Sequence, residues 1–578
     1  MRFARHSLIS IFIIIIAFIF NSCEDFFNPN QDLIITEDEL FDDWYEYRSV
    51  EMGLYALQNQ LVEQIIILGE LRADMLTITP NADADLIAIY NFNITKENKY
   101  ASPTNFFKLI SACNNLIHIL QREHPEVIEP ESPVTNYDRL YGEVICMRAW
   151  AYFNAVLIYG KVPYIHESLV TINEIEDFVS STGTYIDSVY IEFGIDGYHN
   201  VDTILNKQIV LEKQLMDLDV VLDMFIGQLE NDVKVVGVNH SINNKDISWE
   251  ILVWNTWAWH ALLGKLYMYQ GDLGRAAFHF EKIMYNNTQN LRYQLDGTFS
   301  YGNWQRIFST LDNTEHIFTL WFDKDNFQKN GLQDLFESRA PHNYMLKPSI
   351  QGLRIWEYSN DRNRGAGESY SFIKGGNYFD QLSESQLQEV RRLRQRRDYE
   401  SADIIIEGYD TVVYKYSLGK GTFDDDAYFN IYRAAEIHLD LAEIYTYWAF
   451  EDRGNVRTYT LNALNILNDG SNYYISSSRP QMGVRGRVGL RGIDLNRLEN
   501  GNLAAKQEYL DQRILEERGR ELGFEGKRFY DLMRISKRLN NPWFLANKVA
   551  AKYPSGGKRN QIRAFLADEN NWYIHYFD

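Results

Sequence analysis

The chain contains little cysteine, with three residues of this type among 578. Cys113 and Cys146 lie in apolar stretches with helical spacing, whereas Cys23 stands apart near the start. Two cysteines form one disulfide at most, which cannot staple a chain of this length. The sequence therefore excludes a disulfide framework, and we expect Cys113 and Cys146 to be buried free thiols.

Positive charge is also scarce, because 79 acidic residues outnumber 57 basic ones and the net charge is −22. Phosphate backbones bind to basic faces, so this balance excludes a nucleic-acid partner. A strongly acidic surface is typical of a well-solvated protein that faces outward. The basic run 391–397 is interpreted as a solvated helix face rather than a docking site.

Motifs for catalysis or cofactor binding are missing. No two histidines stand four residues apart as on a zinc-binding helix, and no G-x-S-x-G elbow occurs. Gly419–Thr422 lacks the spacing of a phosphate-binding loop. The glycine-rich run 483–492 indicates a flexible loop, since no strand-to-helix turn surrounds it. We expect no cofactor and no enzymatic activity.

Two acidic clusters resemble incomplete calcium sites. Residues 81–85 begin like a calcium loop, but the sixth position is not glycine and the twelfth is Phe92. We interpret this segment as a solvated turn. Asp424, Asp425 and Asp426 offer three carboxylates in a row, which is more typical of an acidic helix N-terminus before Tyr428. We expect no metal at either cluster.

Long apolar runs are absent except at the N-terminus, where Leu8–Phe20 follows Arg2 and Arg5. About 13 apolar residues are too few to cross a bilayer core comfortably, which takes ~20, and they fit the apolar region of a secretory signal. A small residue directly before Cys23 resembles a lipoprotein cleavage site. We predict a signal peptide at 1–22, acylation of Cys23 and a flexible tether at 23–42. An uncleaved membrane anchor is the alternative.

Helical periodicity is strong in the first third of the chain. It predicts helices over about 43–68, 106–120 and 137–159, the last one ending at Gly160 before Val162-Pro163. Residues 249–286 match the spacing of a tetratricopeptide repeat, in which small residues let two antiparallel helices approach closely. Residues 435–467 repeat this pattern more loosely. Residues 286–422 are mostly irregular with short strand-like runs at 317–322 and 411–416, and we expect the binding region there.

The most distinctive stretch is Arg513–Arg534, RILEERGRELGFEGKRFYDLMR. Ile514, Arg518 and Leu522 lie four apart on one helical face, and Phe529, Leu532 and Met533 restart an apolar stripe. The stretch therefore predicts two helices, with a turn at Gly523 and Gly526. Interleaved carboxylates and guanidinium groups favour a salt-bridged structural helix pair. A hydrolase site built from two of the carboxylates is the alternative.

This stretch and Arg148–Ile165, RAWAYFNAVLIYGKVPYI, resemble the SusD/RagB family of nutrient-binding lipoproteins of Bacteroidetes. The resemblance implies a mainly α fold, in which tetratricopeptide-like helix pairs support a large loop-rich region with short strands. It also implies one ligand-binding domain over 43–578, with an N-terminal part at about 43–240 and a C-terminal part at about 245–578. Glu24 and Asp25, directly after Cys23, resemble the surface-export signal of such lipoproteins.

The function that the resemblance implies is binding of an oligosaccharide at the cell surface. The glycan would pass to a SusC-like TonB-dependent transporter in the outer membrane, which is the expected partner. A peptide-binding protein of the RagB type, a surface glycoside hydrolase and a tetratricopeptide scaffold that binds only protein remain alternatives. Because sugars stack on aromatic rings, the candidate ligand residues are Tyr90, Tyr100, Tyr301, Trp304, Trp321 and Trp356.

Overall fold

The computed structural model describes most of the chain between residues 40 and 577. The described residues are 40–123, 125–128, 130–180, 185–192, 204–211, 215–237, 247–284, 293, 295, 303–311, 313–359, 372–374, 411–417, 419–451, 463–464, 466–467, 483–485, 487, 493 and 503–577. The predicted signal peptide and Cys23 lie outside this part of the chain, as does the basic run 391–397.

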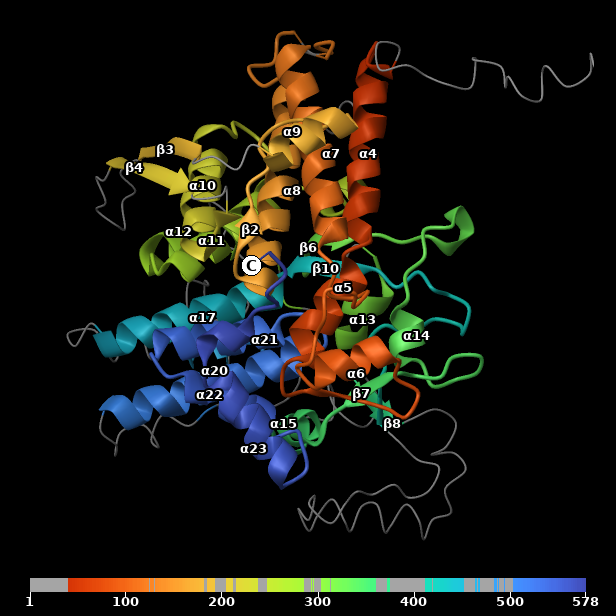
Figure 1. The fold of residues 1–578 in the computed structure, drawn as a ribbon, viewed down its shortest axis with the longest axis vertical. Coiled ribbons are helices and arrows are strands. Elements are labelled where there is room, and N and C mark those ends of the chain that lie inside the picture. Colours follow the sequence, from red (N-terminus) through yellow and green to blue (C-terminus); the bar gives the residue numbers. More distant parts are fainter. Residues whose placement is uncertain are drawn as a thin grey trace, which may run out of the picture.

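The described residues are mainly helical, which confirms the predicted fold class (Figure 1). The longer helices are α4 (Trp44–Asn59), α7 (Thr104–Arg122), α8 (Asn136–Tyr159), α9 (Ile172–Ser180), α10 (Leu218–Asn231), α11 (Thr256–Gln270), α12 (Leu273–Met284), α15 (Ile350–Ser359), α17 (Ala434–Glu451), α20 (Leu503–Leu522), α21 (Arg528–Arg538), α22 (Pro542–Ala550) and α23 (Gly557–Leu566). The shorter helices are α5 (Val62–Ile66), η2 (Ile67–Leu71), α6 (Ala84–Tyr90), η4 (Ile247–Ile251), α13 (Asn303–Ser309), η5 (Lys324–Asn326), α14 (Leu332–Phe336) and η8 (Glu569–Trp572).

The strands are short and form two-stranded antiparallel ribbons within the described residues. The ribbons are β1 (Leu76–Ile78) with β7 (Leu346–Pro348), β2 (Val162–Pro163) with β5 (Leu215–Met216), β3 (Tyr185–Glu192) with β4 (Ile204–Leu211), β6 (His316–Leu320) with β10 (Phe429–Arg433), and β8 (Phe372–Lys374) with β9 (Thr411–Val413). Several of them join segments far apart in sequence, so they fix the loops on the helical body.

Helices α4, α7 and α8 lie side by side (Figure 1) and account for the three helices predicted near the N-terminus. Asp43 begins α4 with a capping box, since its carboxylate accepts from the N–H of Glu46 and the Glu46 side chain accepts from the N–H of Asp43. Gly160 ends α8 at φ 75°, as predicted. The first predicted helix was too long, because α4 ends at Asn59 and the chain continues as α5 and the π-helical η2.

Helices α11 and α12 form the predicted tetratricopeptide-like pair. Gly264 lets them approach, because a Cβ atom built there would lie 2.4 Å from the ring of Phe280. Gly271 ends α11 in the left-handed region at φ 91°. Helix α17 forms the first half of the looser repeat at 435–467. Most of the second half of that repeat lies outside the described residues.

The region predicted to be irregular, 286–422, contains more regular structure than expected. Helices α13, α14 and α15 lie within it, although the strand-like runs do form β6 and β9. Short helices such as α14 escape a periodicity analysis, because five residues complete little more than one turn.

The signature stretch forms α20 and α21 with a turn between them, and most of its charged side chains are buried, whereas those of Arg513, Glu516 and Lys527 are partly exposed. Arg518 donates to Asp440 at 2.6 Å and to Asp531 at 2.8 Å. Arg433, from β10, donates to Glu521 at 2.7 Å and to Glu525 at 2.9 Å. These carboxylates are neutralised by guanidinium groups, which supports the structural interpretation of the helix pair.

One hydrophobic cluster runs through the described chain from Trp44 to Ile574. Cys113 and Cys146 are buried free thiols within it, as predicted. Among the described residues, no helix combines the length and the apolar character needed to cross a bilayer.

Candidate functional site

The candidate site is built on the ribbon of β6 and β10. In this ribbon Leu320, the last residue of β6, pairs with Phe429, the first residue of β10. The loop that follows β6 and the loop that precedes β10 therefore leave the same end of the ribbon. Two segments about 100 residues apart in sequence become neighbours in this way.

Trp321 begins the first of these loops and is 46 % exposed. Its backbone is fixed from the end of α4, because the Asn59 side-chain amide donates to the Trp321 carbonyl at 2.9 Å. The next residue, Phe322, is buried in the core. All residues of β6 are buried, whereas just beyond its end successive side chains differ, with the Trp321 ring exposed and the Phe322 ring in the core.

A tight turn presents a second aromatic ring in the same loop. Asp323 and Gln328 exchange backbone hydrogen bonds at 2.9 and 2.8 Å, which closes the turn. Phe327 lies inside it in the left-handed region at φ 60° and is 89 % exposed. A phenylalanine in this conformation is rare, and such outliers concentrate at functional sites.

The second loop, 419–427, carries Phe423, which is 72 % exposed. Backbone and side-chain contacts hold this loop against the first one. The Asn330 N–H donates to the Asp425 carbonyl at 2.8 Å, and the Asn330 side chain donates to the Ala427 carbonyl at 2.6 Å. The two loops are therefore held side by side.

The acidic cluster of this loop is not a helix N-terminus, because the chain enters strand β10 directly after it. Each of the three carboxylates faces a lysine instead. Asp424 binds Lys324, Asp425 lies 3.8 Å from Lys329, and Asp426 lies 2.7 Å from Lys420. The first two pairs join the two loops, whereas the pair of Lys420 and Asp426 lies within the second loop. The described residues contain no cluster of metal-ligating side chains. The segment 81–85 is likewise more than a solvated turn, since Asp83 caps α6.

A third loop, which follows α14, braces the second one. His342 bonds the Thr422 carbonyl at 2.6 Å and the Asp334 carboxylate at 2.8 Å. Burial lowers the pKa of His342, but the hydrogen bonds to Thr422 and Asp334 raise it further, so that the net pKa lies above its ordinary value. Arg339 also donates to the Lys420 carbonyl at 3.2 Å.

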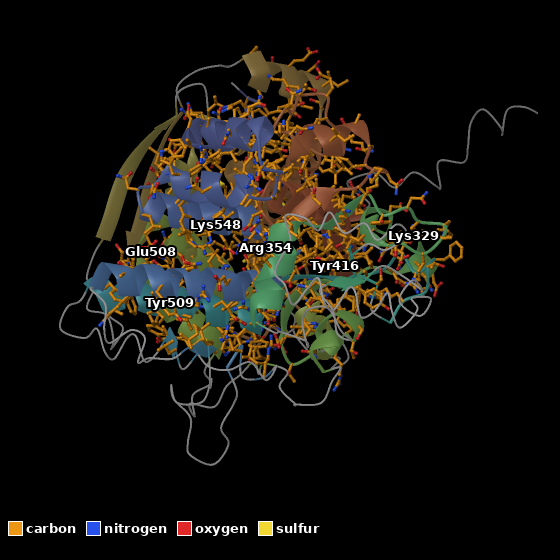
Figure 2. The ribbon with its side chains drawn as sticks, turned by 90° about the horizontal axis from the view of Figure 1, so that it is seen from below. Lys329, Arg354, Tyr416, Glu508, Tyr509 and Lys548 are labelled. Carbon is orange, nitrogen blue, oxygen red and sulfur yellow. The ribbon has the colours of Figure 1, made fainter. Side chains whose placement is uncertain are left out.

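We call Trp321, Phe327 and Phe423 the aromatic loop surface. Figure 2 shows Lys329, which closely follows Phe327 in the sequence, toward the outer side of the molecule, and Tyr416, which is buried, farther inside. Exposed aromatic rings on a braced loop offer flat apolar faces, and neighbouring lysine and aspartate side chains offer hydrogen bonds. This combination suits a ligand with a flat C–H face and hydroxyl groups at its edge, which is the chemistry of a sugar ring.

The aromatic residues predicted from the sequence lie in different environments. Tyr90 is half-buried, with its ring centroid 4.8 Å from that of Tyr553. Tyr100 is half-buried and donates to Asp83 at 3.0 Å; burial, the largest cause, raises its pKa to about 12. Trp321 is exposed. Tyr301 lies outside the described residues, as do the side chains of Trp304 in α13 and Trp356 in α15.

Phe327 and Phe423 were missed by the sequence analysis. Each lies in a segment of turn-forming residues, DKDNF for Phe327 and GKGTFDDD for Phe423. An aromatic residue inside such a polar turn has no core to enter. That signal was available, but it does not reveal that the two turns meet.

Two cavities near the signature helices are too small for an oligosaccharide. One of about 90 Å³ is lined by Arg518 and Asp531, and one of about 200 Å³ lies between α11, α17 and α21. Pockets that bind small molecules usually measure about 300–1,000 Å³. The signature residues therefore support the fold rather than a ligand.

Comparison with known proteins gives a consistent family. The model of the SusD family matches residues 285–576. SusD-like protein P38 of Formosa agariphila is 27 % identical over 181 residues, which is 30 % of this chain and 33 % of that protein. The chain thus matches about a third of the length of this curated relative.

Solved structures agree with the chain over most of its length. A SusD superfamily protein from Bacteroides thetaiotaomicron is 17 % identical, with a TM-score of 0.56, 92 % of this chain covered and 95 % of the other. A laminarin binding SusD-like protein is also 17 % identical, with a TM-score of 0.53, 89 % of this chain covered and 95 % of the other. At these identities the likeness establishes a shared fold.

Proposed function

The chain belongs to the SusD family, and from this premise we propose that it is a glycan-binding lipoprotein of the cell surface. Its domain, 43–578, binds an oligosaccharide and delivers it to a SusC-like TonB-dependent transporter in the outer membrane. The observation that carries the glycan assignment is the aromatic loop surface, on which Trp321, Phe327 and Phe423 are exposed on loops held together by hydrogen bonds and ion pairs. A structural neighbour named for laminarin binding supports the same ligand class.

Binding, rather than hydrolysis, is the role that the loop chemistry supports. A glycosidase needs two carboxylates on opposite sides of the scissile bond, one of them available as an acid. Asp424, Asp425 and Asp426 instead face lysines, and hydrogen bonds and the charge of Lys324 lower the pKa of Asp424. An ionised, lysine-paired aspartate is a hydrogen-bond acceptor for a hydroxyl group rather than a proton donor.

Trp321→Ala tests the ligand surface. If the indole stacks on a sugar, the variant loses about 1–3 kcal/mol of binding free energy, by analogy with base stacking, and its melting temperature stays within about 1 °C of the parent. Affinity is measured by calorimetry with laminarin oligosaccharides, after a glycan array has identified any better ligand.

Trp543→Ala is the matched control for this experiment. Trp543 is 48 % exposed on α22, close to the 46 % of Trp321, and does not belong to the aromatic loop surface. Equal affinities of the two variants for every glycan that binds would refute the assignment. A large fall in the melting temperature of Trp321→Ala alone would instead make the indole a structural residue.

The anchor is tested by Cys23→Ala. The short apolar run before Cys23 supports cleavage and acylation at this residue. The variant should remain unprocessed or be released from the membrane, as judged by fractionation and by labelling with a palmitate analogue. Continued acylation and surface exposure of the variant would contradict the lipoprotein assignment.

A further inference from the structure

A groove lies between the turn after α6 and helix α23, both in the lower half of the view in Figure 1. Its main pocket has a volume of about 670 Å³ and includes Asn91 and Asn93 from the turn and Lys558 and Gln561 from the helix. An adjoining pocket of about 260 Å³ shares Phe92 and Phe565 with it. We call these two pockets the α6–α23 groove, and the volume of the main pocket is in the range that accepts small ligands.

Phe92 supplies a wall of the groove through an unusual backbone conformation. The N–H of Phe92 donates to the Ile89 carbonyl, and that of Asn93 donates to the Ala88 carbonyl. This pattern is a Schellman motif, whose left-handed residue is usually glycine. Phe92 holds that position at φ 55°, so the turn keeps a ring where glycine would be easier to accommodate.

The ring of Phe92 is positioned by two other aromatic residues. Its centroid lies 6.5 Å from that of Phe529 in the core and 6.0 Å from that of Phe565 on α23. Phe565 is 38 % exposed. The Phe529 and Phe565 rings therefore hold the Phe92 ring in place. Phe92 and Phe565 form an apolar face in the groove, between the amide side chains.

The charge of the groove is opposite to that of the whole protein. Although acidic residues outnumber basic ones by 79 to 57, none of the described residues that line the two pockets is an aspartate or a glutamate. The lining includes the exposed Lys96 and Lys558 and the buried Arg72. The Lys96 ammonium lies 5.5 Å from the ring centroid of Tyr576, which orients it at the adjoining pocket.

Described carboxylates near the lining residues in the sequence are Glu70 and Asp74, on either side of Arg72, Glu97, beside Lys96, and Asp568 and Glu569, just before Asn571. None of them lines the groove. Glu70 and Asp74 are buried in the core, where Asp74 accepts from Arg528 at 2.8 Å. The Asp568 carboxylate caps its own turn by accepting from the Asn570 N–H at 3.0 Å. The positive charge of the groove is thus not cancelled by a lining carboxylate, and it attracts an anion.

We propose that the α6–α23 groove is a second saccharide site, separate from the aromatic loop surface, that selects sugars carrying a carboxylate or a sulfate group. Phe92 and Phe565 offer the apolar face for the ring. The amides of Asn91, Asn93 and Gln561 bond hydroxyl groups, and Lys558 and Lys96 bind the acidic substituents. An amide can donate and accept at once, which suits a hydroxyl group, whereas an ammonium only donates and so requires an acceptor.

Lys558→Gln tests this proposal, with Arg563→Gln as the matched control. Both residues are exposed on α23 and both variants lose one positive charge, but only Lys558 lines the groove. Calorimetry on the full mature protein uses three probes: tetragalacturonate for the carboxylate, a κ-carrageenan tetrasaccharide for the sulfate, and neutral cellotetraose.

At least one acidic probe should bind more tightly than cellotetraose, and its affinity should fall as salt is raised from 50 to 300 mM. Lys558→Gln should weaken that binding about fivefold, the effect of one partly exposed ion pair, and Arg563→Gln less than twofold. The acidic probe that binds identifies the substituent. Failure of both acidic probes, equal binding of cellotetraose, or equal effects of the two variants would overturn the proposal. Trp321→Ala reports on the loop surface alone, so the two proposals fail separately.

Discussion

Replacement of Phe529 by alanine should destabilise the fold strongly, because this side chain packs in the core and lines neither candidate ligand site. Phe529 lies in α21 and is fully buried. The Arg72 guanidinium lies 4.3 Å from its ring centroid, and the rings of Phe92 and Tyr530 lie at 6.5 and 6.2 Å. Arg72 is itself buried and donates to the Leu68 and Trp572 carbonyls at 2.8 and 2.9 Å. The ring therefore packs where three distant segments of the chain meet.

The loss of unfolding free energy in this variant follows from the burial of the Phe529 ring and from the cavity that its removal leaves. A fully buried Phe→Ala change costs about 3–5 kcal/mol, and the fixed guanidinium prevents the site from collapsing, which places Phe529 in the upper half of that range. For 578 residues, an unfolding entropy of about 2 cal/mol/K per residue gives roughly 1.2 kcal/mol/K. The melting temperature should therefore fall by about 3–4 °C.

Urea denaturation followed by tryptophan fluorescence measures this loss, together with calorimetric melting. Phe423→Ala is the control, because it makes the same chemical change at a side chain that is 72 % exposed, and its cost should stay within about 0.5 kcal/mol. Equal urea midpoints for the two variants would refute the inference that Phe529 is a packing residue. A loss of glycan binding with unchanged stability would make the signature helices a ligand site.

Two further perturbations test the core. Glu70 is fully buried, and burial raises its pKa to about 8 despite hydrogen bonds from the N–H groups of Lys527 and Arg528. Its stabilising contribution is complete below pH ~4.5 and is lost as pH rises through 8, so Glu70→Gln should melt higher than the parent at pH 8 by a margin that vanishes near pH 5. Gly264→Ala should cost about 1–3 kcal/mol, because the new methyl group would meet the Phe280 ring between α11 and α12.

Each of these variants has a clear contradicting outcome. A difference in melting temperature between Glu70→Gln and its parent that stays constant from pH 5 to pH 8 would mean that Glu70 does not titrate in this range. For the glycine, Gly274→Ala in α12 is the control, since its Cβ would meet only Asp272 at 3.6 Å. Equal stability of the two alanine variants would show that the helix pair does not depend on close approach at Gly264.

Local pattern determined the parts of the fold that depend on neighbours in the chain. Helices α4, α7 and α8 were predictable because their apolar residues recur at helical spacing, and Gly160 marked the end of α8. The pair α11 and α12 followed from small residues at fixed intervals, and the turn between α20 and α21 from Gly523 and Gly526. The burial of Cys113 and Cys146 followed from their apolar surroundings.

The site depended on contacts that no local pattern encodes. The sequence does not distinguish Tyr90, Tyr100 and Trp321 as candidate ligand residues. In the structure the Tyr90 ring packs against Tyr553 and the Tyr100 hydroxyl donates to Asp83, whereas the Trp321 ring remains exposed. Whether an aromatic ring is packed or exposed depends on contacts with residues far away in the sequence. Tyr90 and Tyr553, for example, are 463 residues apart.

Sequence alone thus determined the family, the helical class and the acidic character of this protein, because these follow from composition and short-range spacing. Only the tertiary structure joined the loop of Phe327 to that of Phe423, through the pairing of β6 with β10. Only it produced a carboxylate-free groove on an acidic chain, by bringing the turn after α6 against α23. Long-range strand pairing and helix packing select which side chains share a surface, and the chemistry of that surface is the property on which ligand choice depends.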